Sequence, residues 1–169
     1  YLNFDKGAGK RIALQSALTN PSVTVNTYND YQFHERDSVN HGRFGKEFWG
    51  DEMSMLPGRS LSKNFSFSFL DLDETQPLIL STRTGSITHS CSSNLKINVN
   101  GIQQQNITYE PFGDAYYDPV IQIKENKTSI TNPTASVNVQ CVFSPPSNDA
   151  AAYIGNIGIN TRRKLVFRG

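Results

Sequence analysis

The sequence predicts an all-β protein, a sandwich of antiparallel sheets, because three stretches alternate apolar and polar residues with the period of a half-buried strand. The first stretch, residues 95–101, reads LKINVNG and ends in an Asn-Gly pair, which favours a tight hairpin turn. The second is the Phe-rich stretch 65–69, and the third is 137–143. Each places its apolar side chains on one face. We expect the second and third stretches to be partners of the first.

Length and composition define the broad class. The 169 residues begin with Tyr1 rather than Met, and we expect one domain, 1–169, that is a fragment of a longer chain. Hydrophobic residues make up 37% and charged residues 18%, and no apolar run approaches the length of a membrane span. This composition is typical of an extracytoplasmic β protein. A net charge of +1, without a dense Lys/Arg patch before the last residues, argues against nucleic-acid binding.

The first third of the chain gives weaker signals. Residues 11–18 fit either a strand or a short helical turn, and the sequence does not separate the two. Val23 and Val25 indicate a strand after Pro21. The next predicted strand covers residues 28–33, in which the alternation places aromatic side chains on one face.

Residues 34–52 hold two histidines, several carboxylates and the only tryptophan. One interpretation is a sugar or peptide site in which Trp49 or Phe48 is a stacking platform and His34 lies beside hydrogen-bonding acids and amides. The other is a polar surface loop whose Phe48 and Trp49 insert into the edge of the sandwich. We favour the second interpretation.

No metal or cofactor is expected. His34 and His41 are seven residues apart, a spacing that matches no established ligand pattern with Asp37. The acidic residues 71–74 lack the pattern of a calcium loop and read as a solvated connection.

The second half of the chain continues the β pattern. Residues 78–80 are apolar on both faces, which predicts a central strand covered on both sides. After the Asn-Gly turn the chain returns along 102–109. An aromatic loop at 111–119 carries Tyr116 and Tyr117, which join Trp49, Phe48 and His34 as candidate ligand-binding residues. Further strands are predicted at 120–124, 135–143 and 153–159, with a polar segment at 125–132.

Two cysteines, Cys91 and Cys141, lie 50 residues apart and belong to no metal-binding pattern. We expect a disulfide, which would stabilise the fold by about 4 kcal/mol on the chain-entropy model. The alternative is two buried free thiols, because Cys141 lies on the apolar face of its strand. His89 stands next to Ser90 and Cys91, but a nucleophile needs a base placed across a cleft and an oxyanion hole. We therefore assign no catalytic residue.

The order of these segments resembles a known family. A Phe-rich strand, a doubly apolar strand, the L-x-I-x-V-N-G strand and a final I-x-I-N-x-x-R-K-L-x-F-x-G run at 157–169 are similar to the β domain of PorU-type proteins. These are gingipain-related surface cysteine proteases of the type IX secretion system in Bacteroidota. The segment 44–52, followed by Pro57-Gly58, adds to the likeness, which spans about residues 44–169.

The resemblance implies a jelly-roll β-sandwich of the galactose-binding-like kind, without catalysis in this chain. In that family the catalytic Cys and His belong to a downstream protease domain of the same chain. The parent protein removes the C-terminal sorting signal of secreted cargo and attaches the cargo to surface lipopolysaccharide. The resemblance thus implies a cell-surface, outer-membrane-associated location.

The expected role is a scaffold or a docking module for cargo or for other secretion-system components. The alternative is a carbohydrate-binding module that takes a glycan, or a surface adhesin or pilus subunit. In a pilus subunit, an unpaired sheet edge would be completed by a partner's strand.

Overall fold

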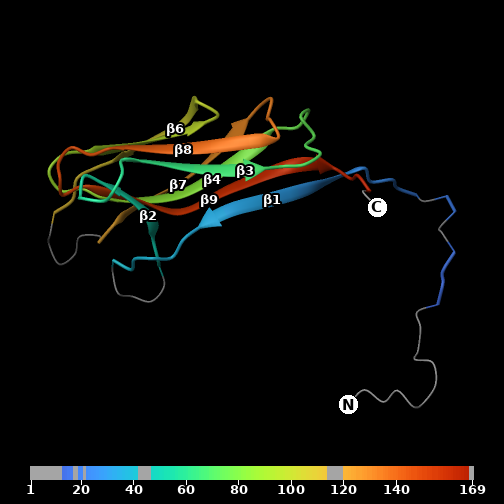
Figure 1. The fold of residues 1–169 in the computed structure, drawn as a ribbon, viewed down its shortest axis with the longest axis horizontal. Coiled ribbons are helices and arrows are strands. Elements are labelled where there is room, and N and C mark those ends of the chain that lie inside the picture. Colours follow the sequence, from blue (N-terminus) through green and yellow to red (C-terminus); the bar gives the residue numbers. More distant parts are fainter. Residues whose placement is uncertain (1–12, 17–18, 21, 42–46, 114–119, 168–169) are drawn as a thin grey trace, which may run out of the picture.

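Two antiparallel β-sheets packed face to face form the fold (Figure 1). The computed structural model describes residues 13–16, 19–20, 22–41, 47–113 and 120–167, and within them it contains nine strands and no helix. The strands are β1 (Thr27–Glu35), β2 (Gly50–Ser54), β3 (Ser62–Ser68), β4 (Leu78–Ile87), β5 (Ser93–Val99), β6 (Ile102–Tyr109), β7 (Gln122–Ile130), β8 (Ser136–Ser144) and β9 (Ala151–Lys164). The predicted all-β sandwich is confirmed.

The strand order is that of a jelly roll. One sheet runs β1-β9-β4-β7, with the short β2 also paired to β9, and the other runs β3-β8-β5-β6. From β3 onward the chain crosses from one sheet to the other at every connection except the β5–β6 hairpin. Within the part of the chain that the structure describes, no helix is long and apolar enough to cross a membrane.

The β5–β6 hairpin forms where the alternating pattern predicts it. Asn100 and Gly101 take left-handed backbone angles, φ 49° and 83°, which an Asn-Gly hairpin turn requires. Strand β5 pairs with β8, as expected. The expectation that the Phe-rich strand also pairs with β5 is wrong, because β8 lies between β3 and β5 and pairs with both.

The inner faces of both sheets make one apolar core. Leu78 and Leu80 of β4 are buried in it, and β4 lies between β9 and β7, so the central position predicted for residues 78–80 is confirmed. Ile79 points to the outer face and is only half-buried, so the predicted cover on both sides is wrong.

Several expected boundaries differ from the structure. Val23 and Val25 lie outside any strand, as do the described residues 13–16. The polar residues 125–130 belong to β7, and β9 continues through the basic residues 162–164, where it pairs with β1. Strand β2 was not predicted. These differences concern strands whose outer face meets water, so their apolar alternation is weak.

The two sides of the sandwich are closed differently. Between β4, β6 and β7, the Gln105 side chain accepts a hydrogen bond from Thr82 at 2.7 Å and donates one to Thr128 at 3.1 Å. Nearby, the Thr84 and Tyr109 hydroxyls share a bond of 2.5 Å. On the opposite side, β1 and β3 are the outermost strands of their sheets. That second side carries the candidate site.

Candidate functional site at strand β1

Strand β1 is an edge strand, and every second residue directs its backbone groups away from the sheet. Its register with β9 is continuous from Thr27 to Glu35, and the Leu165 amide donates to the Asn26 carbonyl at the start of the same ladder. In an antiparallel ladder, hydrogen-bonded pairs alternate along each strand. The even-numbered residues of β1 therefore face β9. The odd-numbered residues present their N–H and C=O groups to the free edge: Thr27, Asn29, Tyr31, Phe33 and Glu35.

This edge lacks several of the features that commonly protect an edge strand, although Asp30 points inward and its Oδ1 accepts a hydrogen bond from the outward N–H of Tyr31 at 3.0 Å. Proteins discourage further pairing with lysines, prolines, bulges or short strands. Strand β1 has nine residues, no Pro or Lys and no register shift. By contrast, β7 carries exposed Lys124 and Lys127, and β6 pairs with β5 through a bulge. The free edge of β1 is thus longer and more regular than the edges offered by β6 and β7.

The inward-facing side chains of β1 fix the strand in place. Asp30 makes an ion pair with Arg163 at 2.9 Å. The Gln32 amide donates to the Ser68 carbonyl of β3 at 2.8 Å. These contacts tie β1 to β9 and to the other sheet, so the edge is presented on a rigid strand.

His34, a candidate residue from the sequence, is held in a defined position by two contacts. Its Nε2 atom donates to Asp51 Oδ2 at 2.6 Å, and its ring packs on Phe65 of β3 with centroids 4.4 Å apart. Asp51, at the start of β2, is a carboxylate whose side chain is 10% exposed and whose φ is 45°. The His34–Asp51 bond joins β1 to β2 where the two strands follow one another along β9.

A groove of about 700 Å³ lies between β1 and β3. Phe65 and Phe67 contribute its apolar surface, while Asn64 and Ser66 line it from β3. Gln32, His34 and Asp51 line it from the other sheet. We call this space the β1–β3 groove.

On the outer face, two aromatic rings of β1 stack on each other. Tyr31 and Phe33 have centroids 5.8 Å apart and ring planes 15° apart, and they are 52% and 60% exposed. The Tyr31 ring lies over Gly158 of β9, since a Cβ at Gly158 would come within 2.6 Å of the Tyr31 hydroxyl oxygen. The predicted shared face of these aromatic residues is confirmed, but that face is solvent-exposed.

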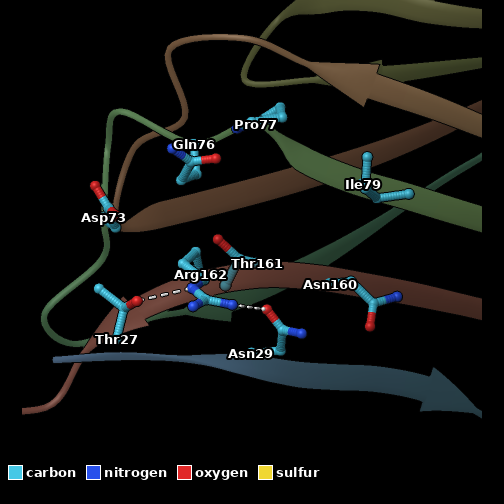
Figure 2. Close-up of a pocket in the computed structure, with 9 residues that line it drawn as sticks. All are labelled: Thr27, Asn29, Asp73, Gln76, Pro77, Ile79, Asn160, Thr161 and Arg162. Carbon is cyan, nitrogen blue, oxygen red and sulfur yellow. Dashed lines mark hydrogen bonds between the residues drawn. The ribbon is translucent and has the colours of Figure 1, made fainter. Parts of the chain in front are cut away.

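Next to this pair is an outer-face pocket of about 560 Å³ (Figure 2). Its floor is Asn29, Asn160 and Arg162, and the loop before β4 closes it with Asp73 and Gln76. Arg162 donates from Nε to Thr27 Oγ1 and from Nη1 to Asn29 Oδ1, both at 2.9 Å. Hydrogen bonding from Thr75 lowers the pKa of Asp73, and the nearby Lys164 and Arg162 charges lower it further.

Trp49 does not serve as a stacking platform. It is 1% exposed and forms a small cluster with Ala151 and Tyr153, next to Ile121. Trp49 is therefore buried, but on the outer face of the β9–β4 sheet rather than inserted into the edge of the sandwich, and its assignment as a sugar platform is wrong. Phe48 is 44% exposed, so its expected insertion is wrong. Adjacent residues on an extended chain point to opposite sides, which explains why only one ring is buried.

Tyr116 and Tyr117 lie outside the described residues. No group of three or more possible metal ligands exists among the described residues. His89 contacts the Phe112 carbonyl through Nδ1 at 3.1 Å and packs against the Phe112 ring.

The expected disulfide is wrong, because Cys91 and Cys141 are free thiols in this structure, one exposed and one buried. Cys141 pairs in register with Ile97 of β5, whereas Cys91 precedes the start of β5 at Ser93. Four strand residues span about 13 Å. Disulfide-bonded Cα atoms lie within about 7 Å of each other. Burial raises the pKa of the Cys141 thiol to about 12.

The sequence alone did not identify Asn29, Asn160, Arg162 or Asp51 as site residues. Their convergence depends on which strands are neighbours, and β1 and β9 are more than 100 residues apart in the chain. The polar run of Asn, Thr and Arg at 160–162 can be seen in the sequence, but which residues it meets depends on the strand that pairs with it.

No protein-family model and no curated protein sequence matches this chain. Among solved structures, the chain is similar to dimeric latent PorU from Porphyromonas gingivalis, with a TM-score of 0.68 and 12% identity over 88% of this chain. It is also similar to a carbohydrate-binding module, CBM36, in complex with calcium and xylotriose (TM-score 0.45, 11% identity, 77% of this chain and 98% of that one). It is similar as well to a CBM36-1 domain of a multidomain xylanase from the hindgut metagenome of Trinervitermes trinervoides. For this domain the TM-score is 0.42 and the identity is 11%, over 77% of this chain and 96% of that one. The chain spans 14% of the PorU chain, and this likeness shows that it shares the β-sandwich fold of a PorU domain.

Proposed function

We propose that this chain is a non-catalytic docking domain that binds an extended segment of a partner polypeptide along the free edge of β1. The observation that carries the proposal is the long, regular free edge, where five consecutive odd-numbered residues direct their backbone groups outward. An added strand would hydrogen-bond to these groups, and its alternate side chains would supply selectivity.

The surroundings of β1 define what kind of segment fits. Side chains of the added strand that point inward enter the β1–β3 groove and meet Phe65 and Phe67. Those that point outward lie beside the exposed rings of Tyr31 and Phe33. The preferred partner segment is therefore extended over at least five residues, with apolar side chains on its outward face and uncharged side chains on the face toward the groove.

We propose further that the chain is one domain, 1–169, of a longer surface protease related to PorU. The fold likeness over 88% of this chain supports this context, as does the motif likeness at 95–101 and 157–169. The location we propose is the cell surface, in association with the outer membrane. The partner is a secreted cargo protein or another component of a type IX secretion system.

A single proline substitution in β1 tests the docking edge. Phe33→Pro removes an outward N–H and places a ring in the path of an added strand, without removing a hydrogen bond to β9. The matched control is Phe33→Ala, which removes the aromatic ring and keeps the N–H. The probe is a purified C-terminal sorting domain of a type IX cargo protein, with binding measured by calorimetry.

We expect Phe33→Pro to weaken binding at least tenfold, and Phe33→Ala to weaken it less. Amide hydrogen exchange should slow at Asn29, Tyr31 and Phe33 in the complex. Absence of binding by the unaltered chain, or equal binding by the proline variant, would overturn the proposal. Circular dichroism and melting of each variant verify that the sandwich is intact.

The parent context has its own test, the sequence of the gene beyond Gly169. A long downstream region with a protease-like Cys and His supports a domain of a surface enzyme. A stop codon shortly after Gly169 would refute that context, and the docking edge would then belong to a free-standing binding or adhesion module.

A further inference from the structure

We infer that the outer face of β1 and β9 holds a binding site for a neutral oligosaccharide, which shares Tyr31 and Phe33 with the free edge of β1 and extends from them over β9. The site comprises the stacked Tyr31 and Phe33 rings and the outer-face pocket beside them. It goes beyond the proposed docking function and uses none of the sugar-platform residues considered in the sequence.

The register of the sheet places the two parts of this site side by side. On β1, Asn29, Tyr31 and Phe33 share the outer face, with successive side chains about 7 Å apart. Tyr31 pairs with Asn160, and Phe33 pairs with Gly158. The two exposed rings therefore continue directly into the polar floor of the pocket, and a chain-like ligand can contact both.

Gly158 makes the aromatic surface accessible to a ligand. Because Gly158 has no side chain, the Tyr31 ring lies against β9 over this residue, and it stacks on Phe33. Exposed aromatic rings are well suited to the C–H faces of sugar rings, which offer an apolar surface edged by hydroxyl groups. Tyr31 and Phe33 are 52% and 60% exposed, so both rings are open to contact with a ligand.

The pocket supplies the hydrogen-bonding part of the site. Among the described residues, the side-chain amides of Asn160 and Gln76 make no hydrogen bond, and each can donate and accept at once. Figure 2 shows Asp73 and Gln76 on the loop before β4, across from Arg162. Vicinal hydroxyl groups match such planar amide, carboxylate and guanidinium groups.

The charges of the pocket select a neutral ligand. Its two charged lining residues, Asp73 and Arg162, have opposite signs, and Arg162 already shares two of its donors with Thr27 and Asn29. The volume of about 560 Å³ falls within the usual range of small-molecule sites. A hydroxyl-rich, uncharged ligand can hydrogen-bond to these groups and leaves the charges of the pocket balanced.

The test is a titration of the ¹⁵N-labelled full chain with cellotriose, xylotriose and mannotriose, and with a trigalacturonate as the charged probe. We expect saturable shifts of the Tyr31, Asn160 and Gln76 signals with at least one neutral trisaccharide. Tyr31→Ala should weaken binding about tenfold and Asn160→Ala about fivefold. The matched control is Phe48→Ala, which removes another exposed aromatic ring and should leave binding unchanged.

Three outcomes would overturn the inference. They are the absence of saturable shifts with every neutral probe at about 10 mM, binding that survives Tyr31→Ala and Asn160→Ala, and binding of the trigalacturonate alone. Asn160 belongs to β9 and not to the free edge, so Asn160→Ala should leave binding of the cargo domain unchanged. The proposal of a glycan site and the proposal of a docking edge can therefore be refuted independently of each other.

Discussion

The two thiols differ in both access and ionisation. Cys91 is exposed, whereas burial within the core raises the pKa of Cys141 to about 12, and the nearby Asp51 charge adds to this effect. Because the thiolate is the reactive form, Cys141 should not react in the native protein. We expect Ellman's reagent to label one thiol per native chain and two in denaturant. A native chain without a reactive thiol, which gains two only after reduction, would show that a disulfide had formed.

His41 gives the fold a pH dependence on the acidic side. Burial lowers the pKa of His41 below its ordinary value of 6.5, and the Glu52 charge opposes this shift only in part. The ring packs edge-on against Tyr153, with centroids 4.4 Å apart, and its Nε2 atom is buried without a hydrogen-bond partner in the described chain. The native state therefore binds a proton less readily than the unfolded state.

Proton linkage gives the direction in which His41 changes stability with pH. Where the unfolded chain binds more protons, the free energy of unfolding falls as the pH decreases. We expect stability to drop as the pH is lowered from about 7 through 6.5 toward 5, and His41→Asn to reduce this slope. Midpoints of urea unfolding at several pH values measure this dependence of stability on pH. An identical slope in the variant would assign the acid sensitivity to the carboxylates instead.

At the scale of elements, the segment leading into β2 is held by Trp49. The ring covers Gly85 of β4 and Gly155 of β9, where a Cβ would approach it to 3.0 and 3.1 Å. The Arg83 guanidinium lies 5.2 Å from the centre of the Trp49 ring. Two glycines on neighbouring strands thus make room for one large aromatic side chain, which closes this end of the outer face.

Replacement of Trp49 should therefore destabilise the whole domain. We expect Trp49→Ala to lower the free energy of unfolding by about 3–5 kcal/mol, the usual cost of emptying a buried aromatic site. The matched control is Phe48→Ala, which alters the adjacent but exposed ring and should cost less than about 1 kcal/mol. Denaturant unfolding of both variants measures the difference. Equal costs would contradict the burial of Trp49.

Strands with a clear apolar alternation could be predicted from the sequence, and others could not. Strands β3, β5 and β8 each bury one face in the core, so apolar and polar side chains alternate along them with a period of two residues. Strand β7 is an edge strand with mostly polar residues, and β2 has only five residues, so neither has a strong pattern. Their conformation depends on pairing with β4 and β9, which the local sequence does not encode.

At the scale of the whole molecule, the candidate site depends on strand order. Tyr31 and Phe33 were visible in the sequence as residues that share one face, but that face could equally have met the core. Asn160 becomes their neighbour only because β9 pairs with β1. Local patterns could therefore predict the sandwich, whereas the site required the long-range topology.

The polar seam between the sheets is also a whole-molecule feature. Thr84 of β4 and Tyr109 of β6 are fully buried, and their hydroxyl groups lie 2.5 Å apart across the two sheets. Burial raises the pKa of Tyr109 well above its ordinary value, so the phenol stays protonated at neutral pH. This bond closes the side of the sandwich opposite the free edge of β1.

A double-mutant cycle shows whether this seam holds the sheets together. Tyr109→Phe leaves Thr84 with only a long bond of 3.5 Å to the Lys124 carbonyl, and Thr84→Val leaves the Tyr109 hydroxyl buried without its partner. We expect each variant to lose about 1–3 kcal/mol in the free energy of unfolding. The double variant should lose less than the sum, by about 1–2 kcal/mol, because it leaves neither hydroxyl unpaired. Urea unfolding of the four proteins measures this coupling, and strictly additive losses would mean that the two hydroxyls do not act together across the sheets.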